Sequence, residues 1–190
     1  MRKNSLFLPL FLFLLLAGCN NYDRSNTVNP IIGDRSFIET FGFKPDETLD
    51  NDLRIKTHLQ YIERLLRNKN VSFLTEDLKH KRSRLLDLLR AYATAGKFPR
   101  NYDYLDQRRP CFIDRDKTIC AVGYLIEQTA GRNVAEAINT VHQYDSIFEM
   151  DSKIVDEWIA SSGLTKEECA MIQPTYGPAG TQLRNNIKPV

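Results

Sequence analysis

Two acidic residues in one short loop have the spacing of a metal site. Asp114 and Asp116 alternate in the run 114–117, as the first oxygen ligands of a calcium-binding loop do. The chain lacks the glycine, the further oxygen ligands and the closing glutamate that such a loop needs. Aspartate is also a common turn residue, because its carboxylate accepts hydrogen bonds from nearby backbone N–H groups. We therefore predict a turn, and keep a metal site at Asp114 and Asp116 as the alternative.

The three histidines form no catalytic or zinc-binding pattern. His58, His80 and His142 are far apart in the sequence, whereas a zinc site needs three or four converging ligands. The chain also has no GxSxG or SxxK sequence and no Cys–His signature of a nucleophilic enzyme. We expect each histidine to be solvated or half-buried, and we assign no catalytic residue, metal or cofactor. The competing prediction is a periplasmic hydrolase that uses Asp114, Asp116 or His142 in a cleft.

The first 19 residues combine a basic start, an apolar run and a cysteine. Two basic residues precede an apolar stretch over residues 6–16, and two small residues precede Cys19. The stretch is shorter than the roughly 20 residues that span a bilayer and has the length of a signal-peptide core. This arrangement resembles the bacterial lipoprotein signal with its lipobox. The resemblance implies that residues 1–18 are removed and that Cys19 carries acyl chains such as palmitate; the alternative is an ordinary secretory signal.

An acylated Cys19 would place the protein in the bacterial cell envelope. Each buried methylene contributes about 0.8 kcal/mol, so that several acyl chains hold a protein on a membrane durably. Asn20 follows the cysteine, where the best-known sorting rule has aspartate for inner-membrane retention. By the same resemblance, we expect the outer membrane rather than the inner one.

The charge balance excludes one class of partner. The chain has 26 basic and 24 acidic residues, and removal of the leader takes away two of the basic ones, so that the mature chain is formally neutral. Nucleic-acid binding needs a concentrated positive field, and we predict none. The expected partners are the membrane, through the lipid anchor, and an envelope protein.

Hydrophobic periodicity divides the mature chain into three parts. Residues 19–48 are polar and rich in asparagine, which predicts the lipidated cysteine followed by a flexible tether. Four apolar side chains in this part are expected to dock on the domain: Phe37, Ile38, Phe41 and Phe43. Residues 49–176 carry the helical pattern, and residues 177–190 are expected to form a loose tail.

The domain contains six expected helices, most of them marked by capping residues. Asp50 or Asp52 is expected to cap the first, and Thr75 and Gly96 to bound the second, with these two forming an antiparallel pair. The six are expected near residues 55–66, 76–95, 121–129, 133–141, 154–159 and 165–172, with capping boxes at Asn133/Glu136 and Thr165/Glu168 and a stop at Gly163.

Two short apolar runs around the turn 114–117 predict a β-hairpin. The symmetric register places Cys111 opposite Cys120, where directly opposed Cα atoms lie about 4.5–5.5 Å apart and a disulfide can form. Closing so short a loop would contribute about 2–3 kcal/mol. A bond from Cys169 to either partner, or free buried thiols, are the alternatives.

Two further groups of side chains could form a recognition surface. Aromatic and arginine residues precede the hairpin and could line a cleft beside it, although an ordinary crossing segment also explains them: Tyr102, Tyr104, Arg108 and Arg109. A basic cluster on the second helix could meet anionic lipid, although we expect a solvated face: Lys79, His80, Lys81, Arg82 and Arg84.

These observations predict a mainly α fold, a compact bundle of about five or six helices with one small β-hairpin. The segments 112–125, 162–165 and 172–176 resemble a group of exported bacterial proteins of unknown function, and this resemblance implies no activity. The leading prediction is a membrane-anchored envelope lipoprotein whose domain has a non-catalytic binding or structural role. A periplasmic hydrolase and a metal- or ligand-binding module are the alternatives.

Overall fold

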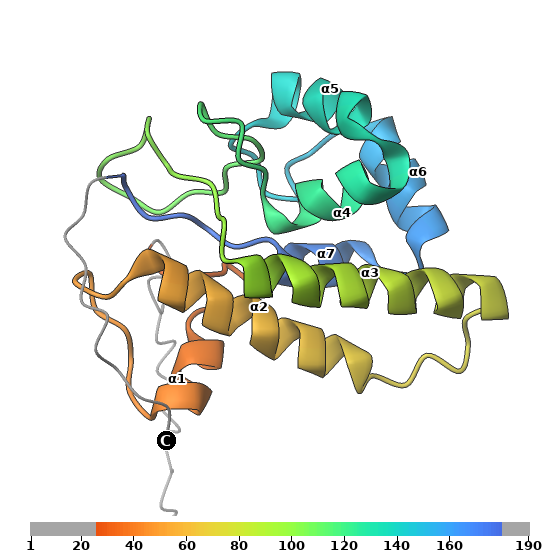
Figure 1. The fold of residues 1–190 in the computed structure, drawn as a ribbon, viewed down its shortest axis with the longest axis horizontal. Coiled ribbons are helices and arrows are strands. Elements are labelled where there is room, and N and C mark those ends of the chain that lie inside the picture. Colours follow the sequence, from red (N-terminus) through yellow and green to blue (C-terminus); the bar gives the residue numbers. More distant parts are fainter. Residues whose placement is uncertain (1–25, 180–190) are drawn as a thin grey trace, which may run out of the picture.

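A computed structural model describes residues 26–179, which fold mainly into α-helices (Figure 1). The described residues form seven helices and no β-strand, which confirms the mainly α prediction and adds one short helix to those expected. The seven are α1 (Arg35–Phe41), α2 (Asn51–Arg67), α3 (Glu76–Ala95), α4 (Ala121–Ala130), α5 (Arg132–His142), α6 (Lys153–Ser162) and α7 (Lys166–Ile172). The predicted leader, Cys19 and residues 180–190 lie outside the described residues.

The two longest helices, α2 and α3, lie side by side and antiparallel (Figure 1). Asp50 caps α2 by accepting hydrogen bonds from the backbone N–H groups of Asp52 and Leu53, and Thr75 caps α3 through the N–H of Leu78. Gly96 ends α3 in the left-handed conformation, with φ 66°. The predicted caps and the antiparallel pairing are therefore confirmed. No helix among residues 26–179 has the length and apolarity needed to cross a membrane.

Helices α4 to α7 cover one side of this pair. α4 is buried on most of its surface, as its apolar sequence predicts. Thr165 and Glu168 form the expected capping box of α7. The box expected at Asn133 and Glu136 is absent, because α5 begins two residues earlier than that box requires, at Arg132 with Gly131 as its N-cap.

The segment before α2 is part of the fold, so the tether prediction is wrong for residues 26–48. Asn29 is fully buried, and its amide nitrogen donates to the carbonyl oxygens of Ala170, Met171 and Gln173 at 2.9–3.2 Å. Phe37 is also fully buried. Asn29, one of the asparagines that suggested a tether, instead satisfies carbonyl groups at the end of α7.

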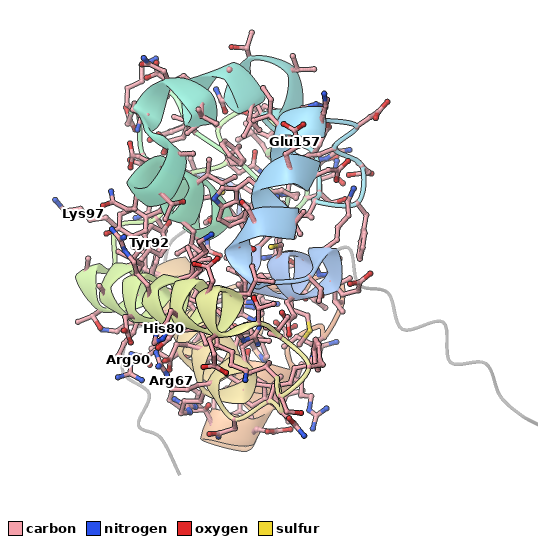
Figure 2. All side chains as sticks on the ribbon, turned by 90° about the vertical axis from the view of Figure 1, so that its right-hand side faces the viewer. Arg67, His80, Arg90, Tyr92, Lys97 and Glu157 are labelled. Atoms are coloured by element: carbon pink, nitrogen blue, oxygen red, sulfur yellow. The ribbon has the colours of Figure 1, made fainter. Side chains whose placement is uncertain are left out.

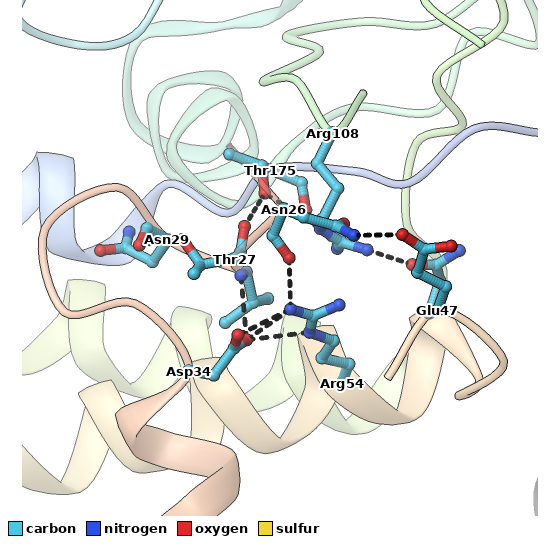
Figure 3. A network of polar contacts seen from close by, with 10 residues as sticks. Asn26, Thr27, Asn29, Asp34, Glu47, Arg54, Arg108 and Thr175 are labelled. Carbon is cyan, nitrogen blue, oxygen red and sulfur yellow. Dashed lines mark hydrogen bonds and ion pairs between the residues drawn. The ribbon is translucent and has the colours of Figure 1, made fainter. Parts of the chain in front are cut away.

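A buried ion pair fixes the same segment to α2 (Figure 3). The Arg54 guanidinium donates to both carboxylate oxygens of Asp34, at 2.9 and 2.7 Å, and to the backbone carbonyl of Asn26 at 2.6 Å. The loose-tail prediction is likewise wrong for residues 177–179, since the N–H of Ala179 donates to the carbonyl of Asn101 at 2.8 Å.

The expected hairpin is reduced to a single antiparallel bridge between Ile113 and Ile119. The loop has three residues between Asp114 and Thr118 rather than four, and Lys117 takes the left-handed conformation with φ 64°, a common loop geometry. The register therefore shifts by one residue, and the N–H of Cys120 donates to the carbonyl of Phe112.

This shift corrects the disulfide prediction, because Cys111 no longer lies opposite Cys120. The described cysteines Cys111, Cys120 and Cys169 are all free and buried. Burial raises the pKa of Cys111 and of Cys120 to about 12 and raises that of Cys169 further. Since the thiolate is the reactive form, these are inert core thiols at neutral pH.

The contact between α3 and the end of α6 predicts a difference between two glycines. Gly163 and Gly96 both have a positive φ, but a Cβ at Gly163 would lie 2.3 Å from the backbone oxygen of Leu78, whereas the nearest atom at Gly96 would be 3.9 Å away. We expect Gly96→Ala to lower the free energy of unfolding by about 1–2 kcal/mol and Gly163→Ala to lower it clearly more. Urea denaturation measures both, and equal losses would contradict the close approach of α3 and α6.

Candidate ligand-binding groove

An open groove of about 520 Å³ lies between α3, the end of α4, α5 and α6. Figure 2 looks onto this end of the molecule, with His80 on α3 and Glu157 on α6. Its volume lies in the range of small-molecule sites, roughly 300–1,000 Å³. The groove is therefore the first place to look for a ligand.

Apolar side chains from three helices form one part of the groove. Leu85 comes from α3, Val134 from α5, and Ile154 and Trp158 from α6. The indole Nε1 of Trp158 donates to the hydroxyl of Thr129 at 2.9 Å, which fixes the ring. Ile154 remains 46% exposed, so the groove offers apolar area to a ligand.

The groove also carries one charge without a partner. Lys81 pairs with Asp77 at 2.8 Å, and Glu157 pairs with Lys153 at 3.4 Å. The Arg84 guanidinium is exposed and has no hydrogen bond or ion pair with the part of the chain that the structure describes. Arg84 is thus the groove cation that is available to an anionic ligand.

The hydroxyl groups of the groove are already engaged. Thr129 donates to the carbonyl of Leu125 at 2.7 Å, and Ser161 and Ser162 donate to carbonyl oxygens of their own helix, α6. These hydroxyl groups donate to helix carbonyl oxygens and not to a ligand. Arg84 therefore remains the charged hydrogen-bond donor of the groove that has no partner among residues 26–179.

A buried ion pair lies behind the groove and holds its helices together. Arg82 of α3 donates to both carboxylate oxygens of Glu168, at 2.6 and 3.1 Å, and to the carbonyl oxygens of Gly163 and Leu66 at 3.0 Å each. The side chains of Arg82 and Glu168 are only 4% and 3% exposed. The predicted solvated basic face is therefore wrong for Arg82, which joins α3 to the ends of α2, α6 and α7.

The environment of Glu168 keeps it ionised. Burial alone would raise the pKa of its carboxyl, but the hydrogen bonds from Arg82 and from Lys69, the latter at 2.7 Å, outweigh burial and lower it. Glu168 also accepts the N–H of Thr165 in the capping box, so that one carboxylate serves both the cap and the ion pair.

The predicted acidic pair shapes the turn, as the turn interpretation expects. The buried carboxylate of Asp114 accepts backbone N–H groups of Asp116, Thr118 and Arg100, each at 2.9 Å. The carboxylate of Asp116 accepts the hydroxyl of Tyr102. No group of three or more acidic, histidine or cysteine side chains among residues 26–179 is placed to hold a metal ion.

The four aromatic and arginine residues before the turn do not line one cleft. Arg109 stacks on the ring of Tyr104 at 4.5 Å, and Tyr102 lies apart, against Asp116 and Arg115. Arg108 is buried on another side and donates to the hydroxyl and the backbone carbonyl of Thr175 (Figure 3). Burial, and secondarily the charge of Arg54, lower the pKa of Arg108 to about 9.

The histidines occupy three different environments. His80 is exposed, and His142 is half-buried with its Nδ1 2.8 Å from Asp145, so the expectation is confirmed for both. His58 is fully buried, so the expectation of a solvated or half-buried side chain is wrong for this histidine. His142 does not line the pocket of about 300 Å³ that Asp114 and Asp116 share, and the three residues of the hydrolase prediction therefore do not line one pocket.

The chain matches no protein-family model, and neither the curated proteins nor the solved structures contain a match to it. The class of the protein is therefore described by its structure, as an α-helical domain with an open groove between α3, α4, α5 and α6.

The buried His58 predicts a measurable pH dependence. Its Nε2 lies 2.9 Å from the carbonyl of Met171, so Nε2 carries the proton and the buried Nδ1 has no partner. Burial lowers the pKa of His58 to about 4 from an ordinary 6.5. Between these values the unfolded chain binds the extra proton and the folded chain does not, so this histidine makes stability fall as the pH falls through that window.

We expect the wild type to lose about 2–3 kcal/mol of unfolding free energy from this group between pH 7 and pH 4.5. His58→Gln should remove that part of the slope, while His80→Gln, at an exposed position, should keep it. Urea titrations at several pH values measure the slopes, and an unchanged slope in His58→Gln would refute the assignment.

Proposed function

We propose that this chain is a lipid-anchored envelope lipoprotein whose helical domain binds a ligand in the groove between α3 and α6 and has no catalytic role. The observation that carries the proposal is the combination of apolar side chains with the unpaired guanidinium of Arg84. Recognition sites commonly pair an apolar surface with a few oriented polar groups. The buried charges, such as Arg82 and Asp34, are instead held by structural contacts.

The position of the groove supports this proposal. Asn26 is seven residues after Cys19, a separation of at most about 25 Å even for an extended chain. Asn26 contacts Arg54 near the beginning of α2, whereas the groove lies beside α6, at the opposite end of the long axis (Figure 1). An anchor at Cys19 would therefore leave the groove open to the aqueous side.

The lipid anchor makes one prediction. In a bacterial host, the wild-type chain should fractionate with membranes and its N-terminal peptide should carry the mass of attached acyl chains, because Cys19 supplies the thiol for the thioether. Cys19→Ala should abolish the acyl mass and release the protein from the lipid phase. Mass spectrometry and detergent partitioning measure both. An unmodified Cys19 in the wild type would contradict the lipid anchor. It would not bear on ligand binding in the groove, which the next experiment tests.

The groove makes a separate prediction. A photo-crosslinking side chain in place of Gln128, which lines the groove, should form an adduct in cells, whether with a small molecule or with a protein. The same side chain in place of Gln60 on α2, which does not line the groove, should form none. Arg84→Glu should reduce the adduct at 128 about tenfold, since it reverses the charge offered to the ligand. Intact-mass analysis measures the yields, and equal adducts at 128 and 60 would contradict the proposal.

A further inference from the structure

The polar part of the groove favours one kind of ligand charge. Lys81 and Arg84 lie three residues apart on α3, on the same side of the helix, and both line the groove. Lys81 is matched by Asp77 and Glu157 by Lys153, so that Arg84 remains as a net positive charge. A carboxylate can accept two parallel hydrogen bonds from a guanidinium, whereas a cationic group would be repelled there.

The apolar part of the groove favours an aliphatic body. Val134, Ile154 and Trp158 are contributed by α5 and α6, and the hydroxyls between them are turned to helix carbonyls. The indole N–H of Trp158 is likewise engaged by Thr129. A ligand that lies here meets carbon surface and needs few polar atoms of its own beyond one acidic end.

We infer that the groove binds an aliphatic carboxylate, with its chain along Trp158, Val134 and Ile154 and its acid group at Arg84. This inference rests on the proposed binding function and names the ligand class for the same groove. The ligand we infer is a free fatty acid.

Trp158 is the single tryptophan of the chain, so its fluorescence reports on the groove alone. The test uses the complete mature chain, residues 19–190 with Cys19→Ala, exported behind an ordinary cleavable signal. Dodecanoate, kept below its micelle concentration, should change the Trp158 emission saturably. Dodecanol and dodecylamine, which have the same chain with a neutral or a cationic end, should bind about tenfold more weakly or not at all.

Variants of Arg84 test whether the carboxylate of dodecanoate binds at this residue. Arg84→Glu should weaken dodecanoate at least about tenfold, and Arg84→Lys should retain part of the affinity because it keeps the charge. Arg64→Glu is the matched control, because Arg64 is an exposed arginine of α2 that does not line the groove. Its affinity should equal that of the wild type, and circular dichroism should show that all three variants are folded.

Three results would overturn the inference. Dodecanol binding as tightly as dodecanoate would make the groove a purely apolar site, and unchanged dodecanoate affinity in Arg84→Glu would place the acid elsewhere. Absence of any saturable change at Trp158 would also overturn it. If the crosslinked adduct at position 128 forms while dodecanoate fails to bind, the binding function stands and only the ligand class is wrong.

Discussion

The ion pair between Arg82 and Glu168 is the constraint on which the groove end of the molecule depends. The two residues are 86 positions apart in the sequence, and the pair brings α3 onto α7 while Arg82 also binds the carbonyls that end α2 and α6. Replacing such a buried pair by well-packed apolar groups is often neutral for stability, but removing one partner typically costs about 3–5 kcal/mol. The pair joins α3 to α7, and the hydrogen bond from Arg82 to the carbonyl of Gly163 joins α3 to the end of α6, the other helix beside the groove.

The opposite end of the molecule is organised by a second polar network. Asp34 and Arg54 pair inside the fold, and Asn29 satisfies three carbonyl groups at the end of α7. Together they make residues 26–34 part of the domain, on the side of the chain that lies nearest to Cys19 in the sequence. The network of Asn29, Asp34 and Arg54 fixes the end of the domain that lies toward the expected anchor. The pair of Arg82 and Glu168 fixes the helices at the end that carries the groove.

The sequence predicts most helix ends that depend on nearby atoms, although not the capping box expected at Asn133 and Glu136. The caps at Asp50, Thr75 and Thr165, and the glycine ends of α3 and α6, involve partners within a few residues, and all are found. The hairpin register was wrong by one residue because the three bonds of Asp114 select a tighter loop than the symmetric turn. The free state of the two cysteines follows from that single shift.

The features that the sequence does not predict have distant partners. Asn29 lies 141 residues from Ala170, and no local pattern distinguishes it from a tether asparagine. Arg82 had a usable signal, since it lies four residues after Leu78 and three before Leu85, on the buried side of α3. The sequence contains no signal for the groove. Periodicity assigns Val134, Ile154 and Trp158 to apolar helix faces, but it does not show which of these side chains a neighbouring helix leaves uncovered.

A crystal structure of the mature chain grown with dodecanoate tests the central claim most directly. The account predicts electron density for the carboxylate within hydrogen-bonding distance of the Arg84 guanidinium and for the chain against the ring of Trp158. Density for dodecanoate at another surface, with the groove holding only water at saturating ligand, would contradict it.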